Sequence, residues 1–238
     1  MIKDYKLDRN GLYIIGKADI EAEIEHIIGE YNPDLLIEPQ PIDLEDFTEN
    51  YLKLNLEYQR LSTDNKFYGL FAFTDGSVDV YDENDVQRSI LVKEKTIILD
   101  PTITNVGEEV FRFTLGHEDG HYIWQYGIIK NNCYEKYDKH EYAVISHRTP
   151  ISRKRELVTK DDWAEWQANY TSACLLTNRT AALKIVSTVL GYDVKYNSGF
   201  ISRMSGYERL LTKHLFMDRF QMSDRAASIR LLELSDSQ

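Results

Sequence analysis

Cysteine, proline and long apolar segments are all scarce in this chain of 238 residues. Its two cysteines, Cys133 and Cys174, have neither the spacing of a metal site nor that of a redox motif, and they do not make a disulfide framework. No apolar run approaches the roughly 20 residues that cross a bilayer. The first residues also lack the apolar segment of a secretory signal. We therefore expect a cytoplasmic protein with no membrane contact.

Basic residues are the minority among the charged ones. The chain has 28 Lys and Arg against 39 Asp and Glu, a formal net charge of -11. A negative protein repels phosphate backbones, so we expect that it does not bind nucleic acid directly. The helix-turn-helix order predicted around Phe220 to Ser223 can nevertheless resemble a DNA-reading motif. A DNA-binding regulator is therefore kept as the third and weakest functional hypothesis.

The most informative motif has two histidines four residues apart, His117 and His121, with Glu118 after the first. On an α-helix, positions i and i+4 lie on the same face, so the two imidazoles can converge on one metal ion. Glu118 lies about 100° around the helix and can reach a metal-bound water without being a ligand. Zinc lowers the pKa of that water, and the glutamate accepts its proton. The motif predicts a zinc peptidase with Glu118 as the general base.

A catalytic zinc needs a third protein ligand. The pattern with a third histidine would require glycine at position 124 and histidine at position 127, where the chain has Trp124 and Gly127. The remaining option is a later glutamate, and the candidates are Glu135, Glu141, Glu156 and Glu165. Only Glu165 lies in a convincing predicted helix, which begins with a possible capping box at Thr159 to Asp162. We expect Glu165 to be the third ligand.

Small and polar residues share the helical face of Glu165. Ala168, Asn169 and Ser172 follow it at positions i+3, i+4 and i+7. A small Ala168 would let the two metal-bearing helices approach closely, and Gly120 inside the motif helix suggests the same close approach. Asn169 is placed to hydrogen-bond a ligand histidine from the second shell.

Several runs, in order, resemble the ImmA/IrrE metallopeptidases. They are Thr96–Asp100, Arg112–His121, Glu165–Leu176, Phe220–Ser223 and Ala226–Leu231, so the match covers roughly residue 60 to the C-terminus. The resemblance implies a zincin-like core and one Zn²⁺ per chain, bound by His117, His121 and Glu165. It also implies a protein substrate, an intracellular repressor of the helix-turn-helix (XRE) type, cut to relieve repression in a mobile element or a stress response.

The chain departs from this family pattern in two places that bear on the site. Asp119 stands where relatives usually carry an apolar residue, so we expect a more polar outer side of the motif helix. The stretch between His121 and Glu165 is also longer than usual. Its His140 and His147, together with Tyr170 beyond it, are possible oxyanion stabilisers, although a loop or packing role is the default for each.

The patterns as a whole predict an α+β fold with a small, mostly antiparallel sheet beside the metal-bearing helices. We divide the chain into a helical N-terminal lead-in (1–58), a zincin-like metallopeptidase core (59–180) and a helical C-terminal lobe packed on the core (181–238). Helical spacing predicts helices over Ala18 to Tyr31 and Leu44 to Leu52. Ser223 should cap the last helix.

Alternating patterns predict the strands of this sheet. They cover Leu54 to Tyr58, Tyr68 to Thr74, Val78 to Tyr81, Ser89 to Val92 and Thr96 to Leu99. Asp75–Gly76 is expected to form a tight hairpin between the second and third of these strands, because both positions tolerate positive φ. An extended peptide could then add to an exposed edge strand beside the zinc.

The leading functional hypothesis is therefore a zinc endopeptidase that cuts a transcriptional repressor. The alternative is a metal-bound interaction module that sequesters the repressor without cleaving it. An intact Glu118 argues against this alternative, because only cleavage needs a proton shuttle at that position.

Overall fold

The computed structural model describes residues 4–9, 11–64, 67–130 and 160–235 of the chain. It is an α+β protein whose residues fall into two compact units. The sheet unit comprises Ile2–Ile15 and Leu44–Ser172, and the helical unit comprises Gly16–Asp43 and Ala173–Gln238. This division differs from the three consecutive segments predicted from the sequence, because segments distant in sequence pack together within each unit.

None of the helices in the described ranges combines the length and the apolar character needed to cross a membrane.

Two small sheets form the strand part of the sheet unit. In the first, β5 (Thr96–Leu99) is central, pairing in parallel with β1 (Asn55–Tyr58) and antiparallel with β2 (Gly69–Ala72). In the second, β3 (Gly76–Tyr81) and β4 (Gln87–Val92) pair antiparallel. Every residue of β5 and of β2 is buried, as expected for strands covered by other elements. The expected small, mostly antiparallel sheet is confirmed, with its strands divided between two sheets.

The hairpin predicted at Asp75–Gly76 is wrong. β2 pairs with β5, and β3 pairs with β4, so these two residues connect strands of different sheets. Neither residue has a positive φ, whereas Asp85, in the turn between β3 and β4, has a φ of 61°. The local Asp-Gly signal failed because β2 belongs to a buried sheet in which it pairs with β5, while the more exposed β3 pairs with β4.

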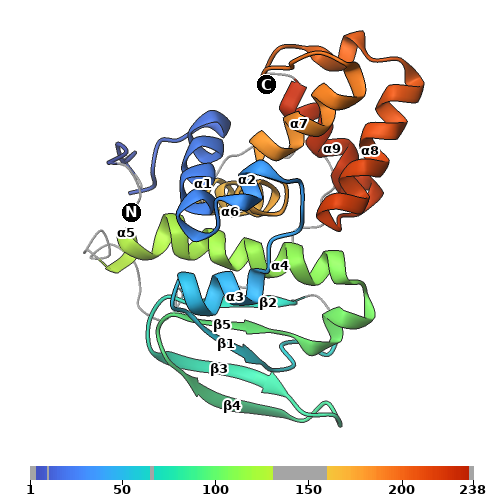
Figure 1. Ribbon diagram of the computed structural model, residues 1–238. Coiled ribbons are helices and arrows are strands. Elements are labelled where there is room, and N and C mark those ends of the chain that lie inside the picture. Colours follow the sequence, from blue (N-terminus) through green and yellow to red (C-terminus); the bar gives the residue numbers. More distant parts are fainter. Residues whose placement is uncertain (1–3, 10, 65–66, 131–159, 236–238) are drawn as a thin grey trace. The chain divides into compact units, whose positions relative to one another are not determined.

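Helical segments of the sheet unit pack on this strand layer. α4 contacts both β2 and β5 and runs along the three-stranded sheet in Figure 1. The second predicted helix is confirmed as α3 and a π-helical turn, η1. The elements are α3 (Leu44–Asp46), η1 (Phe47–Tyr51), η2 (Pro101–Asn105), α4 (Glu108–His121), η3 (Tyr122–Tyr126), α5 (Gly127–Lys130) and the greater part of α6 (Lys160–Leu176).

The buried carboxylate of Asp100 fixes the end of β5. It accepts hydrogen bonds from the backbone N–H of Leu61 at 2.8 Å and from the backbone N–H and hydroxyl of Thr102 at 2.9 and 2.7 Å. The bonds to Thr102 cap η2, which leads into α4. Asp100 therefore links the central strand to the helix that carries the histidine motif.

The helical unit has an apolar core made largely by its C-terminal half. Phe200, Phe216 and Phe220 are fully buried in this core. Ser223 caps the last helix through its side-chain oxygen, which confirms the predicted cap. The predicted first helix is also confirmed. The elements are α1 (Lys17–Tyr31), α2 (Asp34–Ile37), α7 (Arg179–Leu190), η4 (Phe200–Arg203), α8 (Gly206–Phe220) and α9 (Asp224–Ser235).

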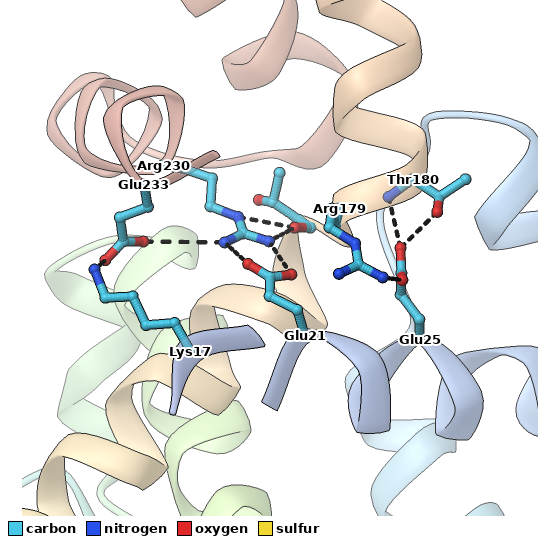
Figure 2. Close-up of polar contacts among 8 residues, drawn as sticks. Lys17, Glu21, Glu25, Arg179, Thr180, Arg230 and Glu233 are labelled. Atoms are coloured by element: carbon cyan, nitrogen blue, oxygen red, sulfur yellow. Dashed lines mark hydrogen bonds and ion pairs between the residues drawn. The ribbon is translucent and has the colours of Figure 1, made fainter. Parts of the chain in front are cut away.

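A buried ion pair joins the first and the last helix of the helical unit, α1 and α9 (Figure 2). The guanidinium of Arg230, on α9, donates to both carboxylate oxygens of Glu21, on α1, at 2.5 and 2.9 Å. It also donates twice to the carbonyl oxygen of Thr177, at 3.0 and 2.8 Å. Both charged side chains are only 1% exposed. Because this geometry is bidentate and leaves neither charge unpaired, it offsets the cost of removing both from water.

We predict that Arg230→Met destabilises the helical unit by about 3–5 kcal/mol, because it leaves the Glu21 carboxylate buried without its cation. The matched control is Lys184→Met, which breaks an ion pair with Glu38 whose side chains are 50% and 67% exposed. That change should cost no more than about 1 kcal/mol. Native-state hydrogen exchange of the α1 and α9 amides measures both, and equal protection in the two variants would contradict the prediction.

Candidate metal centre

The motif histidines converge on one point. They lie on the same face of α4, and their Nε2 atoms are 3.0 Å apart. Both side chains are buried, His117 at 6% exposure and His121 at 1%. Two imidazole nitrogens so close together need a proton or a metal ion between them, because two lone pairs facing each other repel.

Glu165, on α6, completes a group of three. Its Oε2 lies 3.5 Å from Nε2 of His117, and its Oε1 lies 3.3 Å from Nε2 of His121. With metal–ligand bonds of about 2.1 Å, the corners of a tetrahedron lie about 3.4 Å apart. The observed separations, which involve both carboxylate oxygens, are close to this spacing, and one ligand atom from each residue lies within 4.8 Å of the others, so the group could hold a metal ion. The other candidate ligands, Glu135, Glu141 and Glu156, lie outside the described residues.

Two glycines of α4 allow this convergence. A Cβ on Gly120 would lie 2.9 Å from the Cα of Ala168, and a Cβ on Gly116 would lie 2.9 Å from the Oγ of Ser172. The hydroxyl of Ser172 in turn donates to the carbonyl oxygen of Phe113 at 2.8 Å. The predicted close approach at Gly120 and Ala168 is confirmed. Small residues one turn apart on both helices set the separation of the histidines from Glu165.

Glu118 is fully buried beside the histidines. Its Oε2 has no hydrogen-bond partner within the described part of the chain. Burial raises the pKa of Glu118 to about 8; His121 opposes the rise and Glu165 adds to it. A cation in the site would favour the carboxylate form again. Glu118 is thus a buried carboxyl group beside three side chains that could hold a metal ion.

Gly69 of β2 gives Glu118 its space. A Cβ at position 69 would lie 2.6 Å from Oε1 of Glu118 and 2.6 Å from Cγ2 of Thr114. Because position 69 has no side chain, the backbone of β2 can lie close to the carboxylate of Glu118. Sequence reasoning missed Gly69, although a glycine inside an apolar strand is a signal of close approach.

The hydrogen-bond partner of His121 is Gln125, which sequence reasoning missed, and the hydrogen bond expected from Asn169 to a ligand histidine stays a prediction. The Nδ1 of His121 lies 3.1 Å from Oε1 of Gln125, in the π-helical turn that continues α4. Gln125 donates to Gln167 at 2.9 Å, and Gln167 donates to the carbonyl oxygen of Tyr13 at 2.9 Å. The signal for Gln125 was present, because it follows His121 by the same four residues that separate the two histidines.

The expectation that Asp119 makes the outer side of the motif helix more polar is wrong. The residue is fully buried, and both carboxylate oxygens lie 3.0 Å from the hydroxyl of Thr48, on η1. Burial raises the pKa of Asp119 well above its usual range; the hydrogen bond from Thr48 opposes this shift, and the charge of Glu118 adds to it. Asp119 therefore belongs to the packing of α4 against η1.

Of the three predicted oxyanion stabilisers, only Tyr170 lies among the described residues. His140 and His147 lie outside the described ranges. Tyr170 is buried and stacks on Trp166, with ring centroids 5.9 Å apart. Five residues after Glu165, it is turned about 140° around α6 at 100° per residue, away from the face that carries the ligand.

No model of a known protein family matches the chain, and no curated protein matches it.

We predict that Gly120→Ala destabilises the protein, because overpacking against Ala168 costs about 1–3 kcal/mol and outweighs the roughly 1 kcal/mol that alanine gains in a helix. Gly127 is the matched control, since a Cβ there would meet nothing within 4 Å. Gly127→Ala should stabilise by about 0.5–1 kcal/mol. Chemical denaturation measures both changes, and a stabilised Gly120→Ala variant would refute the close contact.

Proposed function

We propose that this protein is a zinc-dependent endopeptidase. The observation that carries the proposal is the convergence of His117, His121 and Glu165 from two helices, with Glu118 buried beside them. Two histidines and a carboxylate are a common ligand set for a catalytic zinc that keeps one position open. The proposed ligand set therefore leaves room for the attacking water.

The proposed reaction is hydrolysis of a peptide bond. When bound, a zinc ion supplies a Lewis acid for the carbonyl and lowers the pKa of the attacking water. The carboxylate of Glu118 accepts a proton as that water attacks, and then delivers it to the leaving amine as the C–N bond breaks. The buried setting of Glu118 supports this role, because few other groups compete for its proton.

The outer edge of β2 is the proposed place for an extended substrate. The backbone N–H of Asp100 donates to the carbonyl of Tyr68, so the backbone groups of Tyr68, Leu70 and Ala72 face β5. By alternation, those of Gly69 and Phe71 face the other way, where no described strand pairs with them. A peptide added there would pass next to Glu118, which Gly69 contacts.

The proposed substrate is a repressor of the helix-turn-helix type, cut to relieve repression. Support for this step comes from the ordered resemblance to the ImmA/IrrE metallopeptidases, which includes the motif helix and the Glu165 helix. Cytoplasmic location and the absence of direct nucleic-acid binding belong to the same proposal. If the tests below find no cleavage, a module that sequesters the repressor without cutting it becomes the favoured function.

We expect one zinc ion per chain in the wild-type protein and a clear loss of zinc in Glu165→Ala after identical dialysis. The reason is that two histidines alone leave the metal without its anionic ligand. Elemental analysis measures zinc per chain, and Glu94→Ala, on an exposed carboxylate, is the control. Equal zinc in wild type and Glu165→Ala would remove Glu165 from the ligand set.

Glu118→Gln should keep zinc and abolish turnover, because glutamine retains the shape of the side chain and cannot shuttle a proton. General acid–base catalysis is typically worth 10²–10⁴-fold, so we expect at least that loss. Mass spectrometry of new protein N-termini in cells that express either form measures it. New termini in helix-turn-helix proteins with the wild type alone support the proposal, and unchanged biological activity of Glu118→Gln would favour the sequestering module.

A further inference from the structure

Three amide groups form a chain of hydrogen bonds that leads away from His121. It runs from Nδ1 of His121 to Gln125 at 3.1 Å, from Gln125 to Gln167 at 2.9 Å, and from Gln167 to the backbone carbonyl of Tyr13 at 2.9 Å. Both glutamines are buried, at 3% and 1% exposure. Water therefore has little access to the first two bonds, while the bond to Tyr13 is partly buried.

The last member of the chain determines the direction of all the others. A backbone carbonyl oxygen can only accept, so the amide NH₂ of Gln167 must face Tyr13. The oxygen of Gln167 then faces Gln125, which must present its own NH₂ there. The oxygen of Gln125 is left facing His121. Because the oxygen of Gln125 can only accept, Nδ1 of His121 must carry the proton. The unprotonated Nε2 then faces Glu165 and the place of the metal.

We propose that Gln125 and Gln167 are positioning residues that, anchored on the carbonyl of Tyr13, hold the His121 ring with Nδ1–H donating and Nε2 presented to the metal. This inference rests on the proposed function, since it describes how the zinc site would be oriented. A residue that orients a ligand histidine is usually a carboxylate or a single carbonyl. Here two neutral amides do so without adding a second negative charge next to Glu118.

The N-terminal segment holds the anchor in place. The ring of Tyr13 packs edge-on against Trp124 with centroids 6.2 Å apart, and Tyr5 does the same at 6.0 Å. Trp124 is fully buried, and its Nε1 donates to the hydroxyl of Thr171 at 2.6 Å. The backbone N–H of Ile14 also donates to the carbonyl of Lys6 at 2.8 Å, which closes the segment on itself. The segment Tyr5 to Ile14 thereby supports a ligand that lies far along the sequence.

The test compares full-length wild type with Gln125→Met and Gln167→Met. Zinc affinity, measured by competition with a chromophoric chelator, should fall about 10–100-fold in Gln125→Met. Zinc affinity should fall less in Gln167→Met. In that variant Gln125 still faces His121, but its amide loses the bond that fixes its orientation. Asn178→Ala is the control, because it removes a buried side-chain amide hydrogen bond, to the carbonyl oxygen of Leu35 in the helical unit, and should leave zinc affinity unchanged.

The ¹⁵N shifts of His121 in the zinc-loaded protein supply a readout that a general loss of stability does not move. Nδ1 should carry a proton that exchanges slowly in wild type and quickly in Gln125→Met. An unprotonated Nδ1, or wild-type zinc affinity in both glutamine variants, would overturn the inference even if the enzyme cleaves its substrate.

The metal-free protein separates this inference from the proposed function. The side-chain NH₂ of Gln125 should exchange slowly in wild type and quickly in Gln167→Met, whether or not zinc binds. Slow exchange in wild type without any zinc uptake would refute the peptidase and support the amide chain. Fast exchange in wild type would refute the amide chain itself.

Discussion

The close approach of α4 and α6 is the constraint on which the candidate site depends. Gly116 and Gly120 face Ser172 and Ala168, and a single added carbon on either glycine would lie 2.9 Å from an atom of the other helix. A wider helix separation would move Glu165 away from the histidines by the same amount. Because a metal site tolerates only a few tenths of an ångström in its ligand distances, the size of these four residues is part of the chemistry.

The motif helix is enclosed by polar contacts on several sides, and each contact has its own structural reason. Gly69 brings the edge strand up to Glu118, Thr48 bonds the buried Asp119, and Gln125 faces His121. An isolated amphipathic helix would leave these groups to water. Here they are buried, and their positions are set by neighbours from a strand and from two π-helical turns. Such enclosure restricts the side chains of the candidate site, as a preorganised site requires.

The helical unit is stabilised by a different principle. A bidentate ion pair between Glu21 and Arg230 is buried within it, and Arg230 also donates to the carbonyl oxygen of Thr177, the residue that follows α6. The two residues lie 209 positions apart in the sequence. A buried pair with a fixed geometry specifies which helices meet, because any other pairing would leave a charge without its partner. The apolar cluster around Phe216 and Phe220 supplies the remaining burial.

Local patterns predicted most of the elements but not their pairing. The first helix, the strand at Thr96–Leu99 and the cap at Ser223 follow from spacing and side-chain chemistry within a few residues, and all three are present. The Asp75–Gly76 turn failed, because the choice of strand partner depends on burial of whole strands and not on the turn. Gln125 was within reach of the same i+4 reasoning that found His121.

The sequence alone predicts the motif: His117 and His121, four residues apart on a helix, share one face, and Glu118 lies about 100° around from His117, since 3.6 residues make a turn. It also placed Glu165 and Ala168 on one face of a later helix. Only the tertiary structure decided that this face meets Gly120, that Asp119 is buried against Thr48, and that the carbonyl of Tyr13 ends the chain of amides from His121. These contacts join segments far apart in the chain, and their geometry comes from how the helices and strands pack, which no local pattern encodes.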